Sequence, residues 1–437
     1  MDYIYFDEKG PQGQFNISRP FKWEQKLAYA SDNMHSYVGN CFFVSQNDLN
    51  SIESGYKMLE KEYISDKNKT IELKGSIILK QQFEFGVASM KNKSTIFYSR
   101  LFDLLMKFKT NNLLFSISKI SILIDSKLSN WIYFVDEINS EVDARILKYI
   151  ITKYMEIEAP EHVIKVLTSP NSSPYFLLKT IRKDMKKIII ENKSNERMSR
   201  QLNSYSEIIQ LINDTINLKT SNSSIQFNSM KFDWRKVTFA FDLWLSEQTF
   251  LKKSTPENIN LILDRGIPEL PFKSFNLKKI SSDCKSNEII GLRIADVLVA
   301  LAGGYITALR KYSLHDPEKK SETKRLPKEF FELSKDQFEL IKKIYKFYFN
   351  GGKYNFIVDT FFDAEVVFES FIFYVNQYLT IDEYNKVSTE KHIENQWKEN
   401  YENGKDRFNQ MMDSSIIIRE EYGSVKNAVE CGQLRPI

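Results

Sequence analysis

Two aspartates stand at the ends of apolar runs that have the pattern of β-strands. Residues 3–7 are β-branched or aromatic up to Asp7, residues 259–264 are mostly apolar up to Asp264, and a glycine follows each run within three positions. Ligands of open α/β sheets bind at the carboxyl ends of strands, so both acids stand where chemistry is expected. Turn chemistry explains the same pattern, because aspartate is common in turns, and Arg265 offers Asp264 a local ion pair.

A third aspartate, Asp296, lies in the most apolar segment of the chain. Residues 288–309 predict a buried helix because they are apolar nearly all round. A buried carboxylate is costly unless it is paired or binds a metal, and Arg293 offers an i,i+3 ion pair as the alternative. Glu72 is a fourth candidate, with Lys74 on the same side of an extended segment; a solvated strand face is the simpler explanation for it.

Together these acids predict a carboxylate site for a divalent cation. We expect Asp7, Asp264 and Asp296 to be the catalytic residues and to bind the metal, with Glu8 or Glu72 as a further ligand. Oxygen-only ligands suit hard cations such as Mg²⁺ or Mn²⁺. Two such ions held by carboxylates promote in-line phosphoryl displacement.

Composition argues against other kinds of site. The 437 residues are 42% hydrophobic and 27% charged, and the net charge of +4 permits nucleic-acid binding through a local patch without indicating it. Four scattered histidines and three cysteines without CxxC spacing argue against a His-rich metal site, a zinc knuckle and a disulfide framework. Residues 1–8 lack signal-peptide character, and the apolar run after Asp296 is shorter than the roughly 20 residues that span a bilayer. We therefore expect a cytoplasmic protein with no membrane partner.

The elements that must position the acids alternate between strand and helix patterns. We expect a mixed sheet in which the strand at 3–7 is central and the strand at 259–264 lies beside it, because both carry an acid at the same end. Ser45 begins a capping-box pattern, which predicts the start of a helix. Residues 71–79 are expected to be extended or turn-like. The expected strands lie at residues 3–7, 37–44, 112–124 and 259–264.

Two regions are expected along the chain. Residues 1–315 would form an α/β core, interrupted at about 130–250 by a helical insertion. The charged, proline-bounded stretch at 316–327 predicts a linker. Residues 328–437 are expected to form a helical C-terminal region. Its aromatic-rich segment at 356–379 is expected to be a buried helix. Such helices need a surface to bury against, so we expect contact with a protein partner or a second copy of the chain.

Three motifs of the chain resemble those of a known family. They are the opening Asp7-Glu8-Lys9-Gly10, the middle strand Ile259–Asp264, and the helix Gly291-Leu292-Arg293-Ile294-Ala295-Asp296-Val297. In this order they resemble the bacterial domain-of-unknown-function family 3800, of the ribonuclease-H-like superfamily; Glu72-Leu73-Lys74-Gly75-Ser76 is similar to a further motif of many members. Lys9 replaces a small residue of the family pattern, and Arg293 replaces a glutamine.

The resemblance implies a ribonuclease-H-like fold and a metal-dependent nuclease, a possible effector in phage defence or a mobile element. Lys9, Lys74 and Arg293 would then contact the phosphates of a DNA or RNA substrate, although Lys9 and Arg293 would equally neutralise an inactive site. The alternative is an inert ribonuclease-H-like scaffold that binds a protein partner, because a fold does not fix a function. An effector that is active only inside a complex combines the two.

Overall fold

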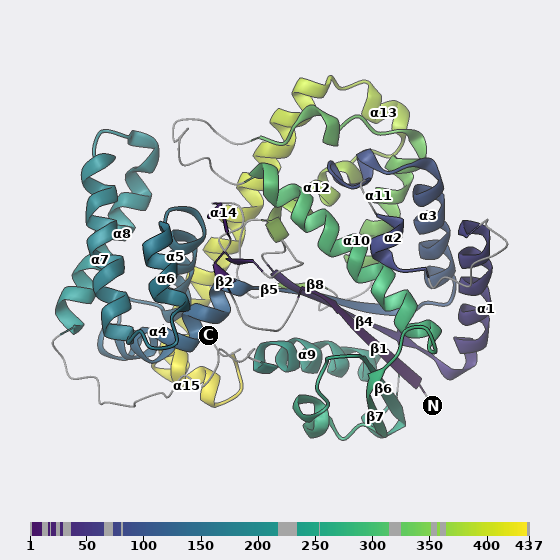
Figure 1. Cartoon of the computed structure of the whole chain (residues 1–437), viewed down its shortest axis with the longest axis horizontal. Helices are drawn as coiled ribbons and strands as arrows, with labels where there is room; N and C mark the ends of the chain where they lie inside the picture. Colours follow the sequence, from purple (N-terminus) through teal and green to yellow (C-terminus); the bar gives the residue numbers. More distant parts are fainter. Residues whose placement is uncertain are drawn as a thin grey trace.

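The structure is a computed structural model of the whole chain (Figure 1). The residues that it describes are 2–10, 16–17, 19–22, 27–28, 36–64, 73–79, 82–216, 234–252, 254–313, 325–350, 356–358 and 364–434.

A mixed six-stranded sheet forms the centre of the molecule, in the order β7-β6-β1-β4-β5-β8. β1 pairs in parallel with β6 on one side and antiparallel with β4 on the other. The expected α/β class, the central position of the first strand and its neighbour at 259–264 are therefore confirmed. The strands are β1 (Asp2–Lys9), β4 (Ser36–Val44), β5 (Asn111–Ser118), β6 (Ile259–Asp264), β7 (Lys279–Cys284) and β8 (Phe356–Val358), with β2 (Asn16–Ile17) and β3 (Leu27–Ala28) forming a separate pair.

Two expected elements change type part of the way along. The strand expected at 112–124 ends at Ser118, whose hydroxyl caps α4 (Lys119–Ile138) by accepting the Ser121 N–H. The apolar run continues through this junction, so hydrophobicity alone does not mark it. The helix expected at 356–379 is also wrong at its start, because residues 356–358 form the edge strand β8 before α12 (Ala364–Asn376).

One face of the sheet is covered by α10 (Ile290–Ser313) and the helices packed around it (Figure 1). α10 is long and apolar enough to cross a membrane, but 78% of its most apolar window is buried inside the protein, as in a core helix. The other helices on this side are α1 (Gln46–Tyr63), α2 (Gly75–Ile78), α3 (Asn92–Lys107), α11 (Lys335–Tyr348) and α12, with the short 3-10 turns at Gly86–Ser89 and Lys328–Phe330.

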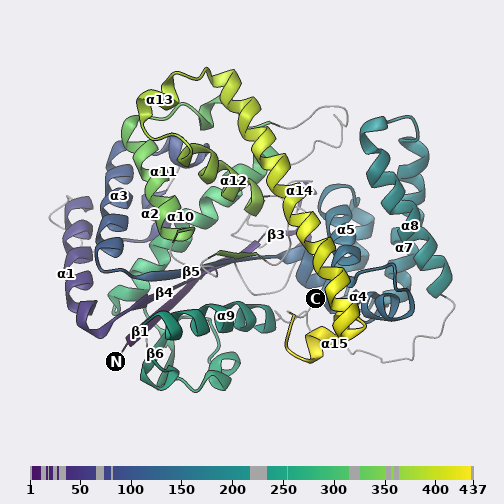
Figure 2. The ribbon, with the colours of Figure 1, turned by 180° about the vertical axis from the view of Figure 1, so that it is seen from behind.

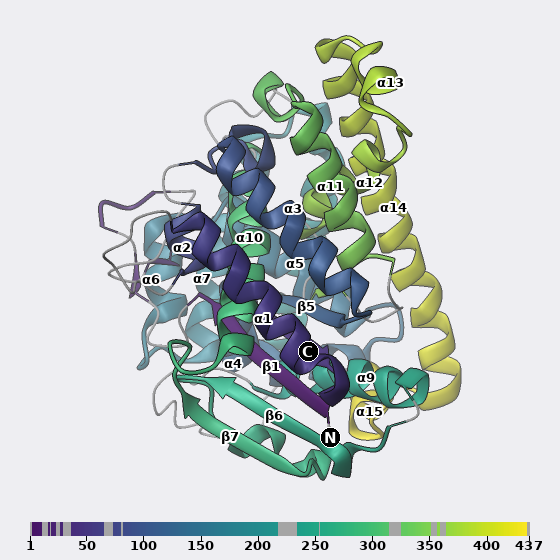
Figure 3. The same ribbon diagram turned by 90° about the vertical axis from the view of Figure 1, so that its right-hand side faces the viewer.

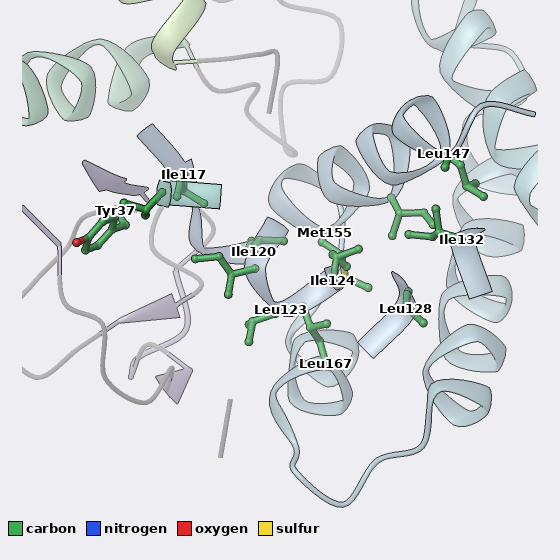
Figure 4. Close-up of a cluster of buried hydrophobic side chains, with 14 of the residues drawn as sticks. Tyr37, Ile117, Ile120, Leu123, Ile124, Leu128, Ile132, Leu147, Met155 and Leu167 are labelled. Atoms are coloured by element: carbon green, nitrogen blue, oxygen red, sulfur yellow. The ribbon is translucent and has the colours of Figure 1, made fainter. Parts of the chain in front are cut away.

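The opposite face packs against α9 (Trp234–Lys252) and the 3-10 turn at Leu270–Phe275. Its hydrophobic cluster continues from Tyr37 and Ile117 on the sheet into the helical insertion, where Leu128 and Leu147 lie (Figure 4). The insertion therefore shares its core with the sheet. Its helices are α4, α5 (Ala144–Ile157), α6 (Glu161–Thr168), α7 (Pro174–Glu191), α8 (Ser199–Thr215) and α9, close to the expected 130–250.

The C-terminal region contributes both to the core and to the back of the molecule. α14 (Thr389–Tyr422) is a 34-residue helix that runs from α12 to the insertion (Figures 2 and 3). Arg419 on α14 pairs with Asp136 on α4, and short helices α13 (Ile381–Asn385) and α15 (Val425–Glu430) flank it. The division at 316–327 stays a prediction, since residues 314–324 lie outside the described part of the chain; α10 before it and α11 after it share one hydrophobic cluster.

Candidate active site

Strand alternation places Asp7 and Asp264 on the face of the sheet that carries α10. On β1, Phe6 belongs to the cluster on the α9 side and Tyr5 to the cluster on the α10 side. Side chains alternate along a strand, so Asp7 shares the side of Tyr5. The parallel register pairs Phe6 with Leu263, and one residue further along each strand the two aspartates come side by side.

A close approach of α10 brings Asp296 to the same place. A Cβ added at Gly291 would lie 2.3 Å from the ring of Tyr5, so only glycine lets the start of α10 approach β1 this closely. Asp296 follows a little more than one helical turn later. Its charge acts on Asp7, as does that of Asp264. Three acids from distant segments therefore share one electrostatic environment.

The electrostatics of the site centre on Asp7, which is only 5% exposed. Burial is the largest cause that raises the pKa of the Asp7 carboxyl well above its usual value, followed by the charges of Asp264 and Asp296. The N–H of Glu8, which donates to Asp7 Oδ1 at 2.6 Å, acts in the opposite direction. A cation between the acids would relieve this repulsion.

The segment that includes Gly75 contacts Asp296 directly. The Gly75 N–H donates to Asp296 Oδ2 at 2.7 Å, at the start of α2. A Cβ on Gly75 would lie 2.2 Å from the Cβ of Ala300, so the glycine permits this contact too. The segment at 71–79, expected to be extended or turn-like, is extended at Lys74 and forms the four-residue helix α2 from Gly75 to Ile78. Glu72 lies outside the described residues.

The other expected site residues do not all lie beside the three aspartates. Glu8 accepts a hydrogen bond at 2.8 Å from the hydroxyl of Tyr37, which belongs to the cluster on the α9 side, so its carboxylate lies on the face opposite Asp7. Lys9 shares the side of Asp7 by alternation, and Lys74 is exposed immediately before α2. Arg293 forms an ion pair with Glu60 of α1 at 2.7 Å, where the sequence had offered Asp296 or a phosphate as its partner.

The donor set fits a hard divalent cation in its chemistry, since every acid brought together offers carboxylate oxygens. Its spacing is wider than that of an assembled metal centre: no group of three acidic, histidine or cysteine side chains in the described ranges is compact enough to hold an ion. Asp7, Asp264 and Asp296 would have to draw together around a cation. Repulsion between like charges favours the wider spacing.

Sequence reasoning missed two polar residues near the acids, the partly buried Glu60 and the fully buried Asn40. Glu60 lies four positions after the buried Tyr56 on the inner face of α1, and this periodicity is its only signal. Asn40 lies opposite Asp7 on β4 and is fully buried, with its amide 2.8 Å from that of Asn112 on β5. An asparagine inside a continuous buried strand was the available signal.

In comparisons with known proteins, no protein-family model, no curated protein and no solved structure matches the chain.

Proposed function

We propose that the chain is a Mg²⁺- or Mn²⁺-dependent nuclease that cleaves nucleic-acid phosphodiester bonds. One observation carries the proposal: Asp7, Asp264 and Asp296 come from three separate elements, and the charges of Asp264 and Asp296 both act on the buried Asp7 at one end of the sheet. A buried carboxyl whose pKa is raised by burial and by neighbouring acids, as that of Asp7 is, is typical of functional sites. The ribonuclease-H-like assignment belongs to the same proposal, supported by the motif resemblance and the mixed sheet.

In this proposal the three aspartates hold the cation, which when bound activates water and stabilises the leaving oxygen. The Gly75 amide fixes the rotation of the Asp296 carboxylate through its hydrogen bond. Lys9, on the same side of β1, and Lys74, exposed beside α2, are candidates to meet substrate phosphates. Arg293 is no longer one of them, because Glu60 holds its guanidinium.

The test compares wild type, Asp296→Ala and a control, Asp214→Ala, which removes an exposed acid of α8 far from the site. Each protein is incubated with single- and double-stranded DNA and RNA in Mg²⁺ or Mn²⁺, and its melting temperature is measured with and without the metal. We expect cleavage, and a rise in melting temperature on adding the metal, for wild type and the control only. A ligand present at a hundred times its Kd stabilises the folded protein by about 2.7 kcal/mol.

The alternative is an inert scaffold for a protein partner. It is favoured by exposed apolar side chains on α14, namely Met412, Ile416 and Ile417, which are 43%, 61% and 55% exposed. Single exposed apolar residues are common, but a row on one helix suits a contact surface. Full activity of Asp296→Ala would refute the nuclease proposal. So would the absence of any metal effect on wild type at millimolar concentration, and the scaffold would then replace it.

A further inference from the structure

The partner of Arg293 is the side chain of Glu60 on α1. Arg293 Nη1 lies 2.9 and 2.7 Å from the two carboxylate oxygens of Glu60. The two side chains are only 14% and 12% exposed, so the pair is largely shielded from solvent. An ion pair in such surroundings fixes its elements firmly, because removing one partner leaves a buried charge without compensation.

Glu60 also holds the segment that leads to the candidate site. Its Oε1 accepts the Leu73 N–H at 3.2 Å. Two residues later, the Gly75 N–H donates to Asp296 Oδ2 at 2.7 Å. Lys74 between them is extended, so the amides of Leu73 and Gly75 point to the same side of the backbone.

These contacts close a ring that begins and ends on α10. Arg293 and Asp296, three residues apart on one face of that helix, reach respectively Glu60 and Gly75, and the Leu73 amide joins the two. The ring ties α1, α2 and α10, which lie together beside the sheet (Figure 3).

We propose that Glu60 and Arg293 are a positioning pair: together they hold residues 73–75 so that the Gly75 amide fixes the carboxylate of Asp296. The pair acts through Gly75 and touches neither metal nor substrate. This inference rests on the proposed function of the site for its consequence, which is metal affinity, but the hydrogen bond itself exists without a metal. Outer residues that orient metal ligands typically change affinity by about 10- to 100-fold.

The test variant is Glu60→Ala, which removes both the ion pair and the acceptor of the Leu73 amide. Its matched control is Glu369→Ala, which breaks an Arg–Glu pair of similar burial between Arg407 on α14 and α12, away from the three aspartates. Both variants lose an ion pair, so both lose stability. We expect Mn²⁺ affinity, measured by titration calorimetry on the full chain, to fall at least tenfold in Glu60→Ala and to stay unchanged in Glu369→Ala.

A second measurement needs no metal. The chain has 15 glycines, so selective ¹⁵N-glycine labelling gives a simple amide spectrum, in which the Gly75→Ala variant assigns the Gly75 signal. A hydrogen bond to a carboxylate shifts that amide proton downfield, and we expect Glu60→Ala to move it upfield while Glu369→Ala leaves it in place. An unmoved Gly75 signal overturns the positioning pair. If wild type binds no Mn²⁺ but the Gly75 signal does move in Glu60→Ala, the proposed function alone is overturned.

Discussion

Gly75→Ala is expected to destabilise the protein although alanine is the better helix former. The added Cβ would lie 2.2 Å from the Ala300 Cβ, and ordinary contact begins at 3.4 Å, so α2 and α10 must separate by about 1.2 Å. The same movement lengthens the bond from Gly75 N–H to Asp296 Oδ2 from 2.7 Å toward about 3.9 Å, beyond hydrogen-bond range.

The free energies decide the sign. Losing a hydrogen bond to a charged group costs about 1.5–3 kcal/mol, whereas alanine gains at most about 1 kcal/mol over glycine in a helix. With the full alanine gain subtracted, we therefore expect a net loss of roughly 0.5–2 kcal/mol in the free energy of unfolding. Urea unfolding followed by fluorescence of the five tryptophans measures it.

The control is the same substitution at Gly404 in α14, where an added Cβ meets no atom within 4 Å. There only the helix preference acts, so Gly404→Ala is expected to gain up to about 1 kcal/mol. If Gly75→Ala is as stable as wild type while Gly404→Ala is stabilised, α2 does not approach α10 closely at Gly75, and the expected loss of the Gly75 hydrogen bond is refuted.

Two pH-dependent predictions follow from buried groups. Asp7 has a raised pKa, so its ionisation opposes folding: stability should fall as the pH rises from 3.8 through the raised value, and Asp7→Asn should remove this slope and be more stable near neutrality. A variant less stable than wild type at pH 7 without metal contradicts this. His392 is buried between the Tyr374 hydroxyl and the Tyr384 carbonyl, and burial lowers its pKa from 6.5. The contribution of neutral His392 to stability is present above pH 6.5 and should be lost as the pH falls below 6.5, which urea midpoints measured at several pH values would show. His392→Gln should lack that pH dependence. An equal slope in both proteins would contradict this prediction.

Much of the central sheet could be predicted because its signals are local. The runs ending at Asp7 and Asp264 are apolar and bounded by turn residues, and a strand of that kind is recognisable without its neighbours. Placing the two strands side by side used one further fact, the acid at the same end of each. The sharp division at Ser118 between strand and helix has no such signal, because both elements are buried and apolar.

The remaining elements depend on contacts between distant residues. β8 is three residues long and pairs with β5 at the edge of the sheet, so its extended form comes from the strand beside it. α14 buries few side chains, and its polar sequence gave no amphipathic face to recognise. Its position is fixed instead by contacts such as the pair of Arg419 with Asp136, 283 residues apart.

The amino-acid sequence by itself determined which acids stand at strand ends or in a buried helix, because alternation, apolar runs and turn residues act over a few positions. Only the tertiary structure decided which side chains meet them. Arg293 has Asp296 three positions away, yet it pairs with Glu60, 233 positions away. The physical reason is that packing brings α1 to α10 and satisfies both charges there, which leaves Asp296 to the Gly75 amide and to the other aspartates.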